Sequence, residues 1–439
     1  MNQLKEIDSY SEIFRENKSL LDIRAPIEFI KGSFPSSSNL PLMTDEERHQ
    51  IGLCYKEKGQ ENAIKLGHEL VKDGLKDHRV SNWLDFINNN PTGALFCFRG
   101  GLRSKIAQEW IYENSGISYP RVKGGYKALR SFLLNEISRI STAKEFMVIG
   151  GQTGCGKTLL LNTLNNSIDL EGLANHRGSA FGNNVSPQPK QINFENNLAI
   201  NLIKKESKSI LLIEDEGSNI GVIQLPEAIK SKSLKSNIII LTASLEERIK
   251  ISIQAYVIDM AKNYCLINSQ NGFEKYSEYW INSLYKIQKR LGGDRYKLLK
   301  KQLNIALTNH KKNEDLAGYF PLIEALLVDY YDPMYNYQIS KKWDMNWKMS
   351  LQSGQAYTPI IGYYNQILPE SPDEVYRTIP GTRNSARYSP YSRLDLGFVY
   401  HTKFFGSKMD VYVQIINLFN RKNTFRKSYN VGSVYNGID

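Results

Sequence analysis

The chain has 439 residues, 41% of them hydrophobic and 23% charged, with 31 glycines and 15 prolines. At about 100 to 200 residues per domain, this length predicts two to four domains, each large enough to bury its own core. The composition excludes a mini-protein, a collagen-like repeat and a wholly disordered chain. The net charge of +11 favours a polyanionic partner such as nucleic acid, with a merely soluble charged surface as the alternative.

The four cysteines are scattered along the chain, unlike the dense set of a disulfide-stapled secreted module. The N-terminal segment carries acids among its apolar residues and lacks the apolar core of a signal peptide. No apolar run approaches the roughly eighteen residues that a membrane-spanning helix needs. We therefore expect a cytoplasmic protein with free thiols and no membrane partner.

The first predicted domain covers residues 1–140. Short apolar runs at 19–29 and 93–98 predict buried strands. Residues 104–116 have helical spacing and end in a glycine, which predicts a helix. This alternation predicts an α/β domain with a parallel sheet covered by helices.

The second predicted domain covers residues 141–342. A buried strand, a glycine-rich turn and a helix follow one another over 145–164. Two further apolar runs, at 209–217 and 236–244, end in polar residues, as sheet strands do when they deliver side chains to a site. After residue 245 the amphipathic spacing predicts helices. The pattern predicts an α/β nucleotide-binding fold with a helical cap.

The last segment, 343–439, has a different texture. It is rich in Tyr, Asn, Ser and Arg, and apolar and polar side chains alternate over 393–401 and 409–415. Two-residue periodicity predicts β-hairpins, so we expect a short β-rich tail.

A complete G-x-x-x-x-G-K-T motif follows the strand of the second domain. Gly151, Gly154 and Gly156 let backbone N–H groups close around phosphate oxygens, and Lys157 adds a positive charge. Thr158 starts the helix, where its hydroxyl could hold Mg²⁺. The motif predicts a P-loop, with a random glycine-rich turn as the alternative.

Polar residues downstream of the P-loop are candidates for supporting roles. Glu214, Asp215 and Glu216 end a predicted strand, and Asp215 is our candidate for approaching a metal or its water. Which of the three acids does so stays open, and a solvated acidic turn is the alternative. His176 and Arg177 could contact a diphosphate or a tRNA backbone, with a hydrogen-bonded turn as the alternative.

A second motif, Cys97-Phe-Arg99-Gly100-Gly101-Leu-Arg103, follows a predicted strand and opens a helix. The thiolate is the reactive form of cysteine, and backbone N–H groups at a helix N-terminus stabilise it. The two arginines act in the same direction. The motif predicts a reactive cysteine, although cysteine is also a common inert core residue.

Asp22 and Arg24, in the segment 22–29, resemble the signature of the rhodanese domain. The resemblance implies that both brace the sheet beside a loop whose cysteine carries sulfur. The spacing from Cys97 to Arg103 is C-x5-R, one residue longer than the usual C-x4-R, and is similar to that of rhodanese-like phosphatases. A C-x5-R phosphatase fused to a P-loop kinase-like domain is therefore the alternative function.

A rhodanese-like domain fused to a P-loop domain resembles the tRNA 2-selenouridine synthase family, over about residues 8–342. The family replaces the sulfur of 2-thiouridine at the wobble position of tRNA with selenium. Four further stretches carry the resemblance: 39–59, 122–130, 169–182 and 330–342.

The resemblance implies roles for both motifs. Cys97 would carry selenium, with selenophosphate from selenophosphate synthetase as the donor. Residues 151–158 would bind the diphosphate of geranyl diphosphate, which alkylates the 2-thio group to an S-geranyl-2-thiouridine intermediate. No tightly bound cofactor and no resident metal are expected, although Mg²⁺ could accompany the diphosphate.

The tail resembles the last strands of TonB-dependent outer-membrane receptors through residues 353–359, 384–398 and 416–423. A few strands cannot close a membrane barrel. We expect a foreign or poorly ordered tail, or a small hairpin sheet. A non-catalytic outer-membrane fragment is the third functional class.

Overall fold

The computed structural model of the protein describes residues 5–72, 74–339, 344–353, 356–366, 375–404 and 407–417. The chain forms two compact units. The first contains residues 1–148, 158–236 and 253–322, and the second contains 149–157, 237–252 and 323–439.

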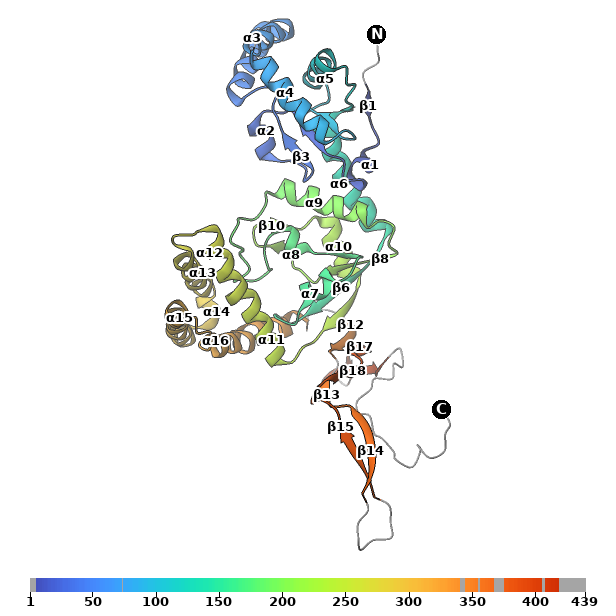
Figure 1. The fold of residues 1–439 in the computed structure, drawn as a ribbon, viewed down its shortest axis with the longest axis vertical. Coiled ribbons are helices and arrows are strands. Elements are labelled where there is room, and N and C mark those ends of the chain that lie inside the picture. The colour runs from blue at the N-terminus through green and yellow to red at the C-terminus, as the bar shows by residue number, and fades with distance from the viewer. Residues whose placement is uncertain are drawn as a thin grey trace. The chain divides into compact units, whose positions relative to one another are not determined.

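The N-terminal part of the first unit is a parallel sheet with helices around it, as the sequence predicts (Figure 1). The strand order is β1-β5-β4-β2-β3. The strands are β1 (Glu6–Ile7), β2 (Leu20–Asp22), β3 (Ser37–Asn39), β4 (Ala94–Phe96) and β5 (Arg121–Val122), and the helices are α1 (Tyr10–Arg15), α2 (Pro26–Lys31), α3 (Asp45–Leu70), α4 (Gly74–Asn89), α5 (Leu102–Ser115) and α6 (Gly125–Ala143).

The prediction of one strand over 19–29 is wrong in its second half. Strand β2 ends at Asp22, and helix α2 begins at Pro26. Proline suits the first position of a helix because its missing N–H would have no intrahelical partner there. The Glu28 carboxylate accepts the Ala25 N–H at 3.2 Å and caps the helix. The apolar run therefore divides into a strand and a helix.

The core of this sheet is apolar and fully buried. Leu21 and Leu95 on neighbouring strands pack with Trp83 of α4, and all three side chains are inaccessible to solvent. The indole N–H of Trp83 donates to the Leu40 carbonyl at 2.9 Å. Full burial of an aliphatic side chain contributes roughly 1.5–3 kcal/mol, so this cluster holds the strand ends in fixed positions.

Helix α3 differs from its neighbours because it adds little to the core. Its only fully buried residue is Ala63. Thr44 and Glu47 form a reciprocal capping box at its start. The backbone at Gly59 has a φ of 81°, which favours glycine, and divides α3 into two helical segments.

The rest of the first unit contains part of the P-loop fold and the helical cap. Strands β7 and β8 pair in parallel. Helix α9 packs on α1 and α6, and its Asn193 and Asn196 hydrogen bond to the backbone of Ser33. The elements are β6 (Glu145–Gly151, shared by both units), α7 (Lys157–Asn162, also shared), β7 (Ser167–Ile168), α8 (Leu170–Leu173), α9 (Gln191–Lys204), β8 (Ile210–Glu214), β9 (Asn219–Ile220), β10 (Ile223–Gln224) and α10 (Glu227–Lys235).

The described part of the predicted cap consists of helices joined by short loops. Tyr276, Trp280 and Tyr319 form an aromatic core, and the Tyr279 hydroxyl donates to the Phe181 carbonyl. The cap in the first unit contains η1 (Ile253–Ile258), α12 (Asp259–Ile267), α13 (Gly272–Lys286), α14 (Gln288–Leu291), α15 (Gly293–Asn313) and the start of α16 (Tyr319–Leu326).

The second unit contains a mixed sheet. Strand β11 pairs in parallel with β12, and β12 pairs with β17 and β17 with β18 in antiparallel fashion. The described part of the tail is rich in strands, as the sequence predicts, and β17 and β18 are neighbouring antiparallel strands. The unit contains β11 (Asn237–Leu241), α11 (Leu245–Ser252), η2 (Leu327–Tyr331), α17 (Asp332–Ile339), β12 (Asp344–Gln352), β13 (Ala356–Tyr357), β14 (Ile360–Gln366), β15 (Val375–Pro380), β16 (Ala386–Arg387), β17 (Tyr391–Phe404) and β18 (Ser407–Ile415).

Among the described residues, no helix has both the length and the apolar character needed to cross a membrane.

Candidate functional site

Cys97 lies directly after strand β4, in the loop that leads into helix α5. The side chain is 2% exposed, and the thiol donates to the Ser104 hydroxyl at 3.3 Å. Gly100 has a φ of 64° and Gly125 a φ of 59°. A Cβ on Gly100 would lie 2.8 Å from the Gly125 nitrogen, and a Cβ on Gly125 would collide with the Cys97 carbonyl oxygen. Two glycines therefore let the backbone of this loop pack closely against the start of α6.

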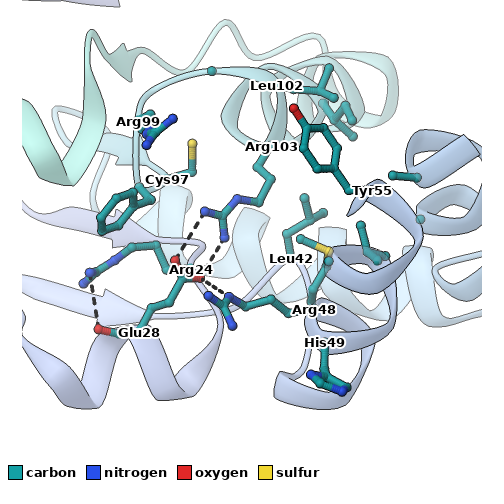
Figure 2. Close-up of a pocket in the computed structure, with 18 of the residues that line it drawn as sticks. Arg24, Glu28, Leu42, Arg48, His49, Tyr55, Cys97, Arg99, Leu102 and Arg103 are labelled. Atoms are coloured by element: carbon teal, nitrogen blue, oxygen red, sulfur yellow. Dashed lines mark hydrogen bonds and ion pairs between the residues drawn. The ribbon is translucent and has the colours of Figure 1, made fainter. Parts of the chain in front are cut away.

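The loop opens into a cavity of about 1280 Å³ that Cys97 helps to line. Figure 2 shows Cys97 beside Arg99, with the Arg103 side chain next to them. Gly101 also lines the cavity and caps the N-terminus of α5. The predicted cysteine is thus buried in the loop but accessible from a cavity, and both predicted arginines lie on the same cavity wall.

Arg103 is held in place by Glu28 of helix α2. Its guanidinium donates to the carboxylate at 2.8 Å, and Arg48 lies 3.3 Å from the same carboxylate. Burial alone would raise the pKa of Glu28, but the hydrogen bond and charge of Arg103, followed by the charge of Arg48, lower it overall. Burial disfavours the charged form of Arg103, yet Glu28 outweighs this and raises the Arg103 pKa. Glu28 is a site residue that the sequence analysis did not single out.

Asp22 and Arg24 form a buried ion pair beneath this wall. The guanidinium of Arg24 donates to both Asp22 carboxylate oxygens and to the carbonyl of Gly32, and both side chains are at most 1% exposed. The Arg24 guanidinium also lies 3.8 Å from the centre of the Tyr126 ring. The pair therefore joins the end of strand β2 to the backbone at Gly32, and its role in bracing the sheet stays a prediction.

We expect Glu28→Gln to lower the free energy of unfolding by about 1–3 kcal/mol at pH 7, because a mostly buried, charged hydrogen-bond acceptor is lost. The Glu28 pKa is lower in the folded state than its ordinary value of 4.5. Its contribution is therefore present above pH 4.5 and disappears as the pH falls through the lower folded-state pKa. Urea unfolding of the variant and of the exposed control Glu57→Gln at several pH values checks this. A deficit that persists in strong acid would contradict the assignment.

The P-loop glycines adopt the conformations that the motif requires. Gly154 and Gly156 have φ values of 81° and 88°. Gly151 has a φ of 151°, and a Cβ there would collide with the carbonyl oxygen of Leu241. The Lys157 ammonium donates to the Gly151 carbonyl at 2.8 Å and lies over the loop. The loop therefore has the glycine conformations that the motif predicts, and its lysine is hydrogen bonded to the loop backbone.

Arg248 supports the P-loop within the second unit. Its Nε donates to the Thr153 carbonyl at 2.9 Å, and its guanidinium pairs with Asp332 at 2.6 Å. The Arg248 side chain is 4% exposed. The sequence analysis missed this residue because its partners lie far away in the chain, although Asp332 falls in the family-like stretch 330–342.

Within the first unit, Thr158 lies in an acidic environment. Its hydroxyl donates to Glu214 at 3.0 Å and to Glu171 at 3.3 Å. Burial, followed by the charges of Glu171 and Asp169, raises the Glu214 pKa to about 8. Of the acids that end the predicted strand, Glu214 hydrogen bonds to Thr158, together with Glu171 from helix α8, whereas our sequence candidate was its neighbour Asp215. Carboxylate and hydroxyl oxygens are the donors that Mg²⁺ prefers. In the described part of the chain, no group of three or more His, Cys, Asp or Glu residues is arranged to hold a metal.

Glu214→Gln is expected to make stability less dependent on pH. The Glu214 pKa rises from 4.5 to about 8 on folding, so the stabilising contribution of its protonated form is complete below pH 4.5 and is lost as the pH rises through 8. The wild type should lose roughly 2–4 kcal/mol of unfolding free energy over this interval, which the variant lacks. Urea unfolding between pH 5 and pH 8.5 measures the difference. Parallel curves for the two proteins would be inconsistent with it.

His176 and Arg177 form a hydrogen-bonded turn. The His176 Nδ1 accepts the Gly178 N–H at 3.2 Å, and burial, followed by the charge of Lys286, lowers the His176 pKa. Arg177 donates to the Ala255 carbonyl at 2.6 Å and lies 5.0 Å from the centre of the Tyr256 ring. These contacts give both side chains structural partners within the first unit.

Comparison with known proteins gives a consistent result. A family model described as the tRNA 2-selenouridine synthase AAA domain matches residues 144–357. Proteins named tRNA 2-selenouridine synthase from Marinobacter nauticus, Sulfurovum sp. and Cupriavidus pinatubonensis are 47%, 46% and 45% identical to the chain. The matches cover 77%, 78% and 77% of this chain and 92%, 94% and 93% of those proteins. The chain belongs to the tRNA 2-selenouridine synthase family.

Proposed function

We propose that the protein replaces the sulfur of 2-thiouridine at the wobble position of tRNA with selenium. Family membership supports the reaction class. The relatives named tRNA 2-selenouridine synthase match this chain over nearly their whole length. The single observation that carries the proposal is the cavity that Cys97 lines together with Arg99 and Arg103. The protein would act in the cytoplasm, where tRNA and the product of selenophosphate synthetase are both present.

The Cys97 loop is our proposed selenium site, with selenophosphate as the donor. Selenophosphate is an anion, and the cavity wall offers it the guanidinium groups of Arg99 and Arg103. The loop also precedes the N-terminus of α5, whose backbone N–H groups favour negative charge. A bound anion at this position would place selenium beside the thiol.

The P-loop is our proposed site for the diphosphate of geranyl diphosphate. Alkylation of the 2-thio group would convert a poor leaving group into a thioether that a selenium nucleophile can displace. Lys157 and the backbone N–H groups of 151–158 would hold the diphosphate as it leaves the geranyl carbon. Thr158 and Glu214 would supply oxygen donors if Mg²⁺ accompanies the diphosphate.

In the proposed exchange step, S-geranyl-2-thiouridine reacts with selenophosphate and water. Selenium forms a bond to C2 of S-geranyl-2-thiouridine, and the C2–S bond breaks with its electron pair leaving on the geranyl thiolate. The thiolate takes a proton, and water cleaves the P–Se bond to release phosphate. The products are 2-selenouridine, geranyl thiol and phosphate.

Nucleoside mass spectrometry tests the proposal. The full chain is supplied to cells that lack their own enzyme of this family, and their tRNA is digested and analysed. Selenouridine, or geranylthiouridine when selenium is withheld, is the expected product. The absence of both would overturn the proposal.

The C-x5-R spacing from Cys97 to Arg103 also suits a phosphatase loop. Rapid release of phosphate from simple phosphoesters without tRNA would favour that function instead. In the structure, Arg103 is directed to Glu28, so we expect little such turnover.

A further inference from the structure

The cavity at Cys97 has two chemically different parts. The part near the thiol is charged, with Arg24, Glu28, Arg99 and Arg103 among its lining residues. Figure 2 shows Cys97 and Arg99 on one side of Arg103, and Tyr55 of helix α3 on the other. Most of the remaining lining is apolar, and six of its side chains, here called the apolar wall, are Met43, Ile51, Leu53, Tyr55, Ile64 and Leu102.

Several side chains of the apolar wall stay exposed to solvent and are not part of the protein core. Leu53, Tyr55 and Leu102 are 44%, 57% and 43% exposed. Helix α3 supplies most of the wall yet fully buries only Ala63 among its 26 residues. Large apolar side chains that gather around a cavity and stay exposed are typical of a ligand site.

The bend in helix α3 brings apolar side chains from both of its segments to the cavity. The chain folds back at Gly59, where the positive φ favours glycine. The two helical segments then pack at Ile51, whose Cδ1 would lie 3.5 Å from a Cβ on Gly67. Ile51 and Ile64, one from each segment, both line the cavity.

The size and polarity of the cavity decide what it can hold. A volume of about 1280 Å³ exceeds the roughly 300–1,000 Å³ of common small-molecule sites, and a phosphate-sized anion needs only a small part of it. The charged part suits the anionic selenium donor and the reacting carbon. The apolar wall suits an uncharged hydrocarbon chain attached to the same reacting centre.

We propose that the apolar wall binds the geranyl chain of S-geranyl-2-thiouridine while the C2–S bond faces Cys97. This inference rests on the proposed function and adds a second prenyl site, separate from the P-loop that binds geranyl diphosphate. The wall holds the chain before the exchange and the departing geranyl thiol after it. Binding of the chain thereby directs the thioether carbon toward the selenium donor.

Direct binding tests the site without requiring turnover. The full chain is titrated with two nucleosides, S-geranyl-2-thiouridine and 2-thiouridine, by isothermal titration calorimetry. The wild type is expected to bind the geranylated nucleoside at least tenfold more tightly. The double variant Leu53→Ser, Tyr55→Ser should lose about tenfold or more of that preference, because contacts with several methylene groups disappear. The control Leu134→Ser changes a leucine on α6 that is 42% exposed and does not line the cavity.

The outcomes separate the site from the proposed function. Equal affinity of the wild type for both nucleosides, or full preference in the double variant, overturns the wall as the chain site. Loss of preference in the Leu134→Ser control overturns it as well. If the preference follows the wall but no selenouridine forms in cells, the proposed function fails while the prenyl site stands.

A kinetic comparison gives a second readout. With selenophosphate, the double variant should show a raised KM for tRNA carrying S-geranyl-2-thiouridine and an unchanged rate for tRNA carrying S-methyl-2-thiouridine, which has no chain to bind. Equal losses on both substrates would indicate a general defect of the loop and would overturn the proposal.

Discussion

The variant Cys97→Ala should lose at least about 1,000-fold in selenium incorporation, as expected when an enzyme loses the side chain that the proposed function places beside the transferred atom. Its geranylation of 2-thiouridine tRNA should stay at the wild-type rate. The thiol lines the cavity and donates its hydrogen bond to Ser104, and the cavity lining includes no P-loop residue. The variant replaces a small buried side chain, so a stability cost of only about 1 kcal/mol is expected.

Two assays on the purified full chain separate these effects. One supplies 2-thiouridine tRNA with geranyl diphosphate, and the other supplies S-geranylated tRNA with selenophosphate. The control Cys265→Ala changes an exposed cysteine outside the cavity. It should keep the wild-type rates of both geranylation and selenium incorporation. Near-normal selenium incorporation by Cys97→Ala would show that the atom does not pass through this loop.

The variant Lys157→Ala should have the opposite defect. Loss of a preorganised positive charge at the diphosphate is expected to slow geranylation by about 100-fold or more. The same variant should convert tRNA that is already S-geranylated at the wild-type rate, because the Lys157 ammonium donates to the P-loop carbonyls of Gly151 and Gln152 and does not line the Cys97 cavity.

The same pair of assays measures this variant, with Lys230→Ala as the control. Lys230 lies on helix α10 and pairs with Glu227 at 3.7 Å, away from the P-loop sequence. A Lys157→Ala protein that geranylates normally would remove the P-loop from that step. Loss of both activities would mean that the two steps share one site.

Local sequence signals predicted the parts of the fold that depend on short stretches of chain. The strand before Cys97 and the strand before the P-loop are short buried runs followed by glycine-rich turns, and both appear where expected as β4 and β6. The cap was predictable because helical spacing persists over many turns. The run at 19–29 was misjudged because apolar content alone does not distinguish a strand from a helix, and the start of α2 depends on Pro26 and its capping contact with Glu28.

The site was less predictable wherever it depends on distant partners. Glu28 and Arg103 are 75 positions apart, and Arg248 and Asp332 are 84 apart, so no local pattern connects them. The choice between Glu214 and Asp215 depends on which side chain turns inward as β8 ends. Glu214 is 1% exposed, and one residue of register decides this.

Strand β12 has a practical consequence for anyone shortening the chain. Residues 344–352 lie in the predicted tail, yet they pair with β11, and the family match continues to residue 357. A stop codon after residue 342 would leave the backbone of β11 unpaired along one side and invite self-association. Trimming for expression should therefore spare everything up to about 357.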